Sequence, residues 1–172
     1  MDHTGHIHIN DSTPGGISKF MPLIIIFTII LAFTFLRQYL HGWNTVYGLN
    51  DFMAGFFLVF GAFKAFSWNT FAEAYSSYDI IAKRSRTYAF IYPLIEIILG
   101  LAFLFRLYPV FTNLVTLLVM SVSAIGVIQA LAQKEEIQCA CLGTIFKIPM
   151  TKVTLFEDLL MAAMAIAMLY LI

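Results

Sequence analysis

Long apolar stretches separated by shorter polar segments dominate the chain. Five of them run from about Phe20 to Leu36, Phe52 to Phe66, Tyr88 to Phe105, Val110 to Leu131 and Leu155 to Ile172. A bilayer core is crossed by roughly 17–25 helical residues, and each stretch is near that length, the second being short. Backbone amides in lipid must be hydrogen-bonded within their own segment, which favours helices. The pattern therefore predicts an all-α, polytopic membrane bundle with five transmembrane helices.

The polar segments predict how this bundle is organised. Residues 1–19 form a polar tail without a basic region or a small-residue cleavage site, so we interpret residues 20–172 as one transmembrane domain with a retained first helix. Asn50 or Asp51 is expected to cap the second helix. The segment Ser67 to Thr87 mixes aromatic and charged residues, as amphipathic segments at a membrane interface do.

Composition narrows the class of protein further. Hydrophobic residues make up 60% of the chain and charged residues 12%, with 10 Lys+Arg against 10 Asp+Glu. Soluble domains carry about 25% charged residues. These values exclude a soluble enzyme, a disordered chain and a nucleic-acid binder, which needs a basic excess. The expected surroundings of the protein are the lipid bilayer.

The polar loop from Ala132 to Lys152 carries both cysteines, in the order Cys139-Ala140-Cys141-Leu142-Gly143. Two residue steps span at most ~7 Å and a disulfide needs Cα atoms about 4.4–6.8 Å apart, so a bond between the two cysteines needs a bent backbone, for which Gly143 offers freedom. The closed ring would be small and strained, and strained disulfides are readily reduced. The pair could instead bind a soft metal such as copper or zinc, or be two unrelated thiols. Redox exchange is the preferred interpretation.

The tail carries His3, His6 and His8, and short His-rich tracts can bind metal. A plain polar tail is the alternative. Four predicted helices separate the tail from the cysteine loop, and this even number places both on the same side of the membrane. A composite site for copper or zinc is therefore topologically allowed.

Two ionisable residues fall inside predicted membrane helices, Lys64 in the second and Glu96 in the third. Charges at such depth mark function or an ion pair. Glu96 is expected to lie roughly 9 Å deeper than Lys64, so a direct pair requires extended side chains or a bridging water. Gln129 is a candidate neighbour of Glu96. Lys64 and Glu96 are candidate cofactor-binding residues, with a quinone as one candidate cofactor.

Acids also open the last helix. Thr154 and Glu157 have the spacing of a capping box, and Glu157 and Asp158 suit the first turn of a helix. We interpret these acids as structural. The alternative is that they flank the thiols and tune them.

One ordered set of residues runs through the second and third stretches, namely Phe60-Gly61-Ala62-Phe63-Lys64, then Phe71, Tyr75, Tyr88, Pro93, Glu96 and Gly100. This order resembles the core pattern of DoxX-like membrane proteins. The C-x-C-x-G loop, followed by Pro149 and an acidic start to the final helix, is similar to the methylamine-utilisation MauE branch of that family. The resemblance covers about Asn50 to Ile172, and the His-containing tail departs from it.

The resemblance implies a redox-associated membrane protein with a DoxX-like four-helix core and one extra N-terminal transmembrane helix. It implies Cys139 and Cys141 as the exchange pair and Lys64 and Glu96 as family-type core positions. Its implied partner is a thioredoxin-like or periplasmic redox protein, and its implied role is maturation of a periplasmic dehydrogenase. The expected location is the inner membrane, with the tail and the C-x-C loop on the periplasmic side.

Basic residues indicate the opposite orientation. Most of them share the side of the tail and the cysteine loop, and only Arg37 and Arg106 lie on the other side. The positive-inside rule places that basic side in the cytoplasm. Our leading hypothesis is a thiol–disulfide relay on the outer face. The alternatives are a copper- or zinc-binding membrane protein, and a quinone-binding or structural subunit of a larger complex.

Overall fold

The computed structural model describes residues 21–133 and 151–172, which form helices and no strand. The helices are α1 (Met21–His41), α2 (Thr45–Phe66), α3 (Trp68–Tyr78), α4 (Arg86–Leu104), α5 (Pro109–Ala132) and α6 (Thr151–Leu171). All except α3 are long and apolar enough to cross a membrane, which makes five candidate spans. The predicted all-α polytopic membrane bundle is confirmed, and the protein is a multi-pass membrane protein.

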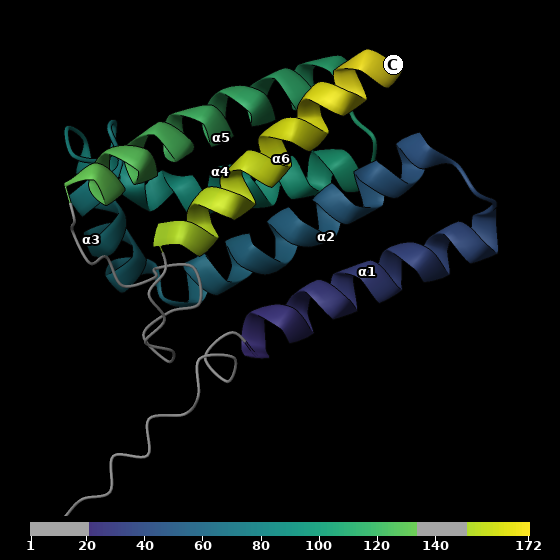
Figure 1. Cartoon of the computed structure of the whole chain (residues 1–172), viewed down its shortest axis with the longest axis horizontal. Coiled ribbons are helices and arrows are strands. Elements are labelled where there is room, and N and C mark those ends of the chain that lie inside the picture. The colour runs from purple at the N-terminus through teal and green to yellow at the C-terminus, as the bar shows by residue number, and fades with distance from the viewer. Residues whose placement is uncertain (1–20, 134–150) are drawn as a thin grey trace, which may run out of the picture.

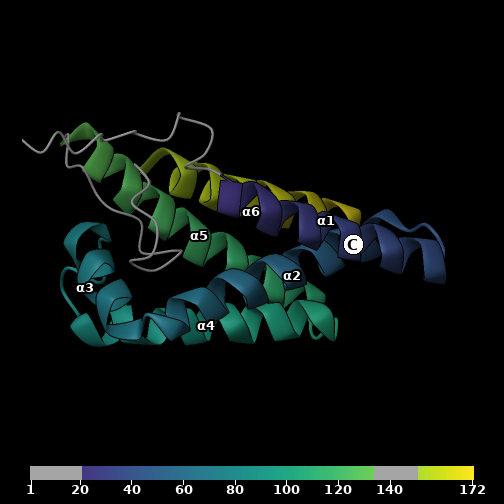
Figure 2. The same ribbon diagram turned by 90° about the horizontal axis from the view of Figure 1, so that it is seen from below.

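The helices pack as two antiparallel pairs with two additions. The most extensive interfaces join α2 to α4 and α5 to α6. The helix α1 lies on the outside of α2, and the short α3 lies across one end of the bundle (Figure 1). We call this the α3 end, and it also holds the C-terminal end of α5 and the start of α6 (Figure 2). The far end holds the α1–α2 connection and the α4–α5 turn.

Small residues allow the first helix pair to approach closely. A Cβ atom on Gly100 of α4 would lie 2.8 Å from Leu58 Cγ and 3.0 Å from the Leu58 backbone nitrogen in α2. A Cβ atom on Gly61 of α2 would lie 3.0 Å from Ile97 Cγ1 and 3.3 Å from Glu96 Cβ in α4. Membrane helices pack in this way because small residues let backbones meet. The consequence is that side chains near Gly61 can reach across the interface.

Two helices begin earlier than the apolar pattern predicts. Helix α2 begins at Thr45, and its cap is Asn44, whose Oδ1 accepts a hydrogen bond from the Tyr47 backbone nitrogen at 3.1 Å. The prediction that Asn50 or Asp51 is the cap was wrong, since both lie inside the helix and are buried. Helix α6 begins at Thr151, so Thr154 is not its cap either. Polar first turns concealed both starts from a pattern built on apolar residues.

The segment after α2 forms the predicted amphipathic element, but two of its aromatic residues are buried in the bundle. Phe71 and Tyr75 of α3 are buried, whereas Glu73 is exposed. Trp68 Nε1 donates a hydrogen bond to the Phe90 backbone oxygen of α4 at 2.7 Å. Helix α3 is therefore packed on the bundle and closes its end.

The first helix is attached to one neighbour. Among the described helices, α1 has backbone contacts with α2 alone. An open, mostly apolar groove of about 490 Å³ separates α1 from the α6 residues Leu160 and Met164. The turn between α1 and α2 contains Gly42, whose φ of 89° is accessible to glycine at little cost.

Candidate functional site

An ion pair joins α2 to α4 inside the α3 end of the bundle. Lys64 Nζ donates to Glu96 Oε1, and the two residues are only 7% and 2% exposed. The expected offset in depth is bridged because Gly61, one turn before Lys64, holds the two backbones close together. The pair is direct, whereas the sequence left open a bridging water.

Aromatic rings surround the ammonium group of this pair. Lys64 Nζ lies 5.1 Å from the centroid of the Tyr92 ring and 5.7 Å from that of Phe71. Tyr75 continues the aromatic wall, with its ring 4.5 Å from that of Tyr92. Cations within about 6 Å of a ring centroid are attracted by the π face. The rings therefore stabilise a charge that has little access to solvent.

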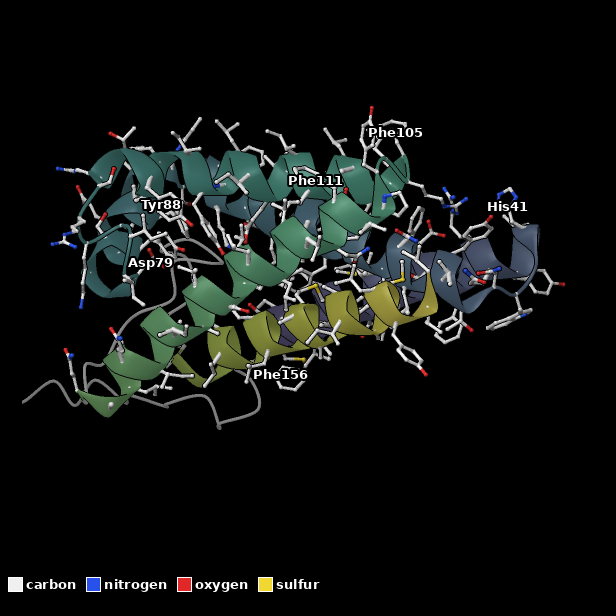
Figure 3. The ribbon with its side chains drawn as sticks, turned by 90° about the horizontal axis from the view of Figure 1, so that it is seen from above. His41, Asp79, Tyr88, Phe105, Phe111 and Phe156 are labelled. Atoms are coloured by element: carbon white, nitrogen blue, oxygen red, sulfur yellow. The ribbon has the colours of Figure 1, made fainter. Side chains whose placement is uncertain are left out.

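Two further carboxyl groups reach this region from α6. Glu157 and Asp158 are 4% and 6% exposed, while their neighbour Phe156 points away from the bundle and is 62% exposed (Figure 3). Ser123 of α5 lies within hydrogen-bonding reach of both Asp158 and Tyr92. The interpretation of these acids as first-turn capping residues was wrong, because α6 begins at Thr151 and both acids lie beyond its first turn.

A small cavity lies among these side chains. Its volume is about 10 Å³, and its lining includes Lys64, Glu96, Ser123, Glu157 and Asp158. A cavity needs roughly 10–15 Å³ to hold one water molecule. The site therefore combines one ammonium and three carboxyl groups, contributed by α2, α4 and α6, around a cavity about large enough for one water molecule. We call Lys64, Glu96, Glu157 and Asp158 the buried charge cluster.

A fourth buried acid, Asp79, completes the α3 end but is fully engaged in local structure. Its Oδ1 accepts hydrogen bonds from the backbone nitrogens of Ile81 and Ala82 at 2.9 and 2.8 Å. Its Oδ2 accepts a hydrogen bond from the Tyr75 hydroxyl at 3.0 Å. Asp79 lies at the same end as Tyr88, far from His41 (Figure 3). These contacts make Asp79 the residue that shapes the turn after α3.

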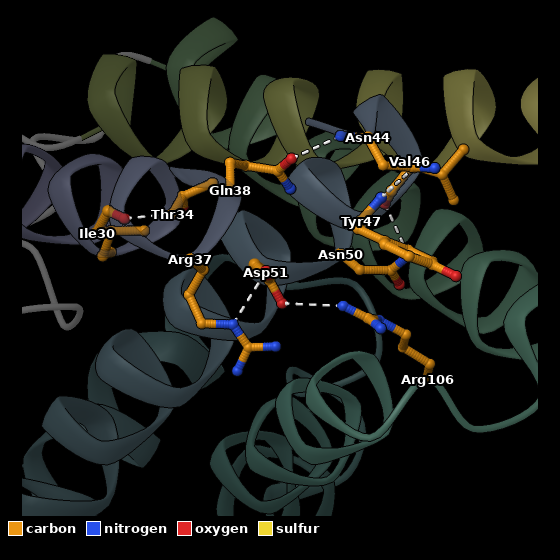
Figure 4. Close-up of polar contacts among 10 residues, drawn as sticks. All are labelled: Ile30, Thr34, Arg37, Gln38, Asn44, Val46, Tyr47, Asn50, Asp51 and Arg106. Atoms are coloured by element: carbon orange, nitrogen blue, oxygen red, sulfur yellow. Dashed lines mark hydrogen bonds and ion pairs between the residues drawn. The ribbon is translucent and has the colours of Figure 1, made fainter. Parts of the chain in front are cut away.

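A second charged group lies at the far end of the bundle. Asp51 of α2 is buried and faces two arginines, with Arg37 Nε at 3.4 Å and Arg106 Nη2 at 3.8 Å (Figure 4). The Arg106 guanidinium also lies 3.9 Å from the centroid of the Tyr47 ring. Arg106 reaches this position from a backbone with φ 55° in the α4–α5 turn. Because these residues link α1, α2 and the α4–α5 turn, we interpret the group as structural.

The structure brings together some of the residues singled out in the sequence and leaves others untested. Lys64 and Glu96 are joined directly, and a role for them in cofactor binding stays a prediction. Gln129 is exposed and does not accompany Glu96 in the interior. The candidates Cys139, Cys141, His3, His6 and His8 lie outside the described residues. Within residues 21–133 and 151–172, no group of three or more His, Cys, Asp or Glu side chains is arranged to hold a metal ion.

Sequence reasoning missed the residues that enclose Lys64 and Glu96. Ser123 lies in the fourth apolar stretch, where a single serine is not a functional signal, and Asp158 is next to a residue pattern that is typical of a helix start. No local signal in the sequence places the start of α6 before Thr154, yet the helix begins at Thr151. With that start, Glu157 and Asp158 fall in the second turn, where acids have no capping role.

Comparison with known protein families identifies the family of this chain. Residues 23–171 match the family described as methylamine utilisation protein MauE. The chain belongs to the MauE family. Searches of curated proteins and of solved structures each returned no match. The family assignment covers all five candidate spans, so α1 is part of the matched region as well as the four helices of the expected core.

Proposed function

We propose that this MauE-family protein is a membrane thiol–disulfide exchange protein that acts through Cys139 and Cys141 with a thioredoxin-like partner. The observation that carries the proposal is the position of the C-x-C pair in the chain. The pair lies between Gln133 and Thr151, and the helices ending and starting there, α5 and α6, both meet the α3 end of the bundle (Figure 1). That end also contains the buried charge cluster.

The proposed reaction is a pair of thiolate displacements. The thiolate of one cysteine attacks a sulfur of the partner's disulfide, which breaks that S–S bond and forms a mixed disulfide. The thiolate of the other cysteine then attacks the mixed disulfide, which closes a Cys139–Cys141 bond and releases the partner's second thiolate. Two electrons pass to the partner, and protons lost by the attacking thiols are taken up by the departing thiolates. The reverse sequence oxidises the partner.

In this proposal the Lys64–Glu96 pair holds α2 and α4 together beneath the exchange region. A quinone at Lys64 and Glu96 is the alternative, and it requires the surrounding helices to separate. The adjoining cavity of about 10 Å³ is of the size of one water molecule, whereas small-molecule pockets have volumes of about 300–1,000 Å³.

Trapping of a mixed disulfide tests the proposal. Each single variant, Cys139→Ser and Cys141→Ser, is produced as the full chain in membranes, and the thiols are quenched with acid before non-reducing electrophoresis. A stable, reducible adduct is expected in the variant that keeps the attacking cysteine but lacks the resolving one. The double variant is the matched control and must form none. An identical thiol-trapping pattern in both single variants and the wild type would contradict the proposal.

Metal binding by His3, His6 and His8 together with the cysteines remains the competing function, and it rests on their spacing in the sequence. Metal analysis of the purified protein separates the two. Stoichiometric copper or zinc that is lost when all three histidines are replaced by alanine would favour metal handling. Metal-free protein that still forms the mixed disulfide favours the exchange function.

We further propose the inner membrane as the location, with the cysteines on its periplasmic face, where disulfides persist. The three basic residues Lys83, Arg84 and Arg86 are exposed at the α3 end and favour the cytoplasm for that same side. The proposal gives priority to the redox chemistry, because an exchange pair acts in an oxidising compartment.

A further inference from the structure

The buried charge cluster contains more acid than base. Lys64 brings one positive charge, whereas Glu96, Glu157 and Asp158 together bring three carboxyl groups. Lys64 forms a direct ion pair with Glu96. If every group were ionised, two negative charges would remain in a region with little access to solvent. Buried like charges that share a site disfavour one another, so such a site binds a proton or another cation.

Asp158 is the member with the clearest unfilled bonding capacity. Its Oδ2 atom is buried and has no hydrogen-bond partner among the described residues, and it borders the small cavity. Its other contact is with the Ser123 hydroxyl of α5. An ionised carboxylate in such a place lacks the donors that would compensate for its removal from water. A protonated carboxyl group is neutral and can donate its own proton.

The charged and polar groups that face Asp158 come from several helices. Helix α2 contributes the ammonium of Lys64, and α4 contributes the carboxyl of Glu96 and the phenol of Tyr92. Helix α5 contributes only the neutral Ser123, and α6 contributes Glu157 itself. Asp79, at the end of α3, accepts two backbone hydrogen bonds and one from Tyr75, so its charge is compensated locally. The described groups around Asp158 therefore include more carboxyl groups than cations.

The cavity volume and the donor set decide between a proton and a metal cation. About 10 Å³ accommodates one water molecule, and no set of three metal-ligating side chains is arranged for a metal ion in the described part of the chain. Metal cations need several ligands at fixed distances, whereas a proton needs one oxygen and a path to water. We propose that Asp158 is a proton-binding site, holding at neutral pH a proton that exchanges with water through the cavity it shares with Glu96 and Ser123.

Asp158 lies where the α2–α4 pair meets the α5–α6 pair, so proton binding there affects how the two pairs pack together. Asp158 lies in the second turn of α6, and its cavity is bordered by side chains of α2, α4 and α5. Loss of the proton would leave a charge at the junction of the two helix pairs and loosen the start of α6. The proton thus stabilises the α3 end of the bundle.

Infrared spectroscopy of the full-length protein in detergent or nanodiscs tests the proposal. The wild type is expected to show the C=O band of a protonated carboxyl group at neutral pH, with a shift to lower frequency in D2O because the proton exchanges. The band should vanish in Asp158→Asn and persist in Glu73→Gln, which removes an exposed acid of α3. The absence of the band from the wild type at neutral pH would overturn the proposal without any variant. Its persistence in folded Asp158→Asn would overturn the assignment to Asp158.

Two further measurements complete the test. Asp158→Asn imitates a protonated acid, so its melting temperature at neutral pH is expected to equal or exceed that of the wild type. A lower value would indicate an ionised, compensated carboxylate and contradict the proposal. Sodium chloride, compared with choline chloride, should leave the band unchanged, and a band abolished by sodium would show a metal-cation site instead. The Cys139→Ser/Cys141→Ser protein should keep the band, so this result is independent of the proposed exchange function.

Discussion

Lys64 and Glu96, 32 residues apart in the chain, meet in a direct ion pair across the α2–α4 interface. The pair lies at a place where Gly61 brings the two backbones together. Its surroundings contain two aromatic rings and two further carboxyl groups. Because the pair has little access to solvent, the stability of the folded protein depends strongly on the presence of both partners. Substitution of Lys64 and Glu96 is therefore an informative test.

Removal of one partner of this pair should be far more harmful than removal of both. Lys64→Met leaves Glu96 buried without its cation, and breaking a buried pair in this way costs about 3–5 kcal/mol. The double variant Lys64→Met/Glu96→Gln removes both charges and should recover most of that loss. Denaturant titration in detergent micelles gives the free energy of unfolding for each. A double variant as unstable as the sum of the two single variants would show that the partners are not coupled.

The arginine pair at the far end predicts a contrast between buried and exposed acids. Asp51→Asn removes a buried charge that faces Arg37 and Arg106 in ion pairs at 3.4 and 3.8 Å, and its loss should cost more than the ~1 kcal/mol that an exposed ion pair contributes at most. Glu73→Gln removes an exposed acid that lies 3.5 Å from Arg86, and its effect should stay below about 1 kcal/mol. The melting temperature should therefore fall in Asp51→Asn and hardly change in Glu73→Gln. Equal effects would contradict a structural role for Asp51.

Glycine positions should respond according to what an added methyl group meets. Gly100→Ala places a carbon against the Leu58 backbone nitrogen, which cannot move away without shifting α2, and overpacking of this kind costs about 1–3 kcal/mol. Gly55→Ala meets only the Ile30 side chain of α1, with Cγ2 at 3.1 Å, and α1 can shift to make room because its backbone contacts, among the described helices, are with α2 alone. The free energy of unfolding should fall more in Gly100→Ala than in Gly55→Ala. The reverse order would show that the α2–α4 contact tolerates expansion.

The cap of α2 gives a test of the corrected helix start. Asn44→Ala removes the side chain that accepts the Tyr47 hydrogen bond, and such losses cost about 1 kcal/mol. Asn44→Ser keeps a capping oxygen and should retain most of the stability. Thermal unfolding followed by circular dichroism measures both. Similar melting temperatures for the alanine and serine variants would mean that the cap contributes little.

Membrane topology can be read by labelling single cysteines in a Cys139→Ser/Cys141→Ser background. Ser77→Cys reports the exposed surface of α3, and Tyr108→Cys reports the far end, where Tyr108 is 79% exposed. A membrane-impermeant maleimide added to intact cells should label Ser77→Cys and the native cysteines of the wild type, but not Tyr108→Cys. Labelling of Tyr108→Cys alone would place the α3 end in the cytoplasm and contradict the proposed orientation.

The fold was predictable from the sequence because lipid leaves the backbone few alternatives. Apolar length alone identified the five spans, and the mixed composition of Ser67 to Thr87 identified a separate element. Helix starts were less predictable, because Thr45 to Asp51 mixes polar residues and a glycine with apolar ones and yet is helical. A prediction that relies on continuous apolar residues ends the helix where polar residues begin, even if the helix continues.

The candidate site was predictable only in part. Lys64 and Glu96 stood out because charges inside apolar stretches are rare. Their direct contact depends on the closeness of α2 and α4, which is a property of packing and cannot be derived from depth alone. Asp158 was hidden because an acid near a helix start has a common local explanation. Its burial depends on the angle at which α6 meets α5, which no local pattern contains.

The attachment of α1 to a single neighbour makes this helix separable from the rest of the protein. All interfaces among the other described helices would survive its departure, and the link between the two parts is the short turn around Gly42. Residues 1–43 and 44–172, produced as two polypeptides in one cell, should therefore associate in the bilayer and restore the native assembly.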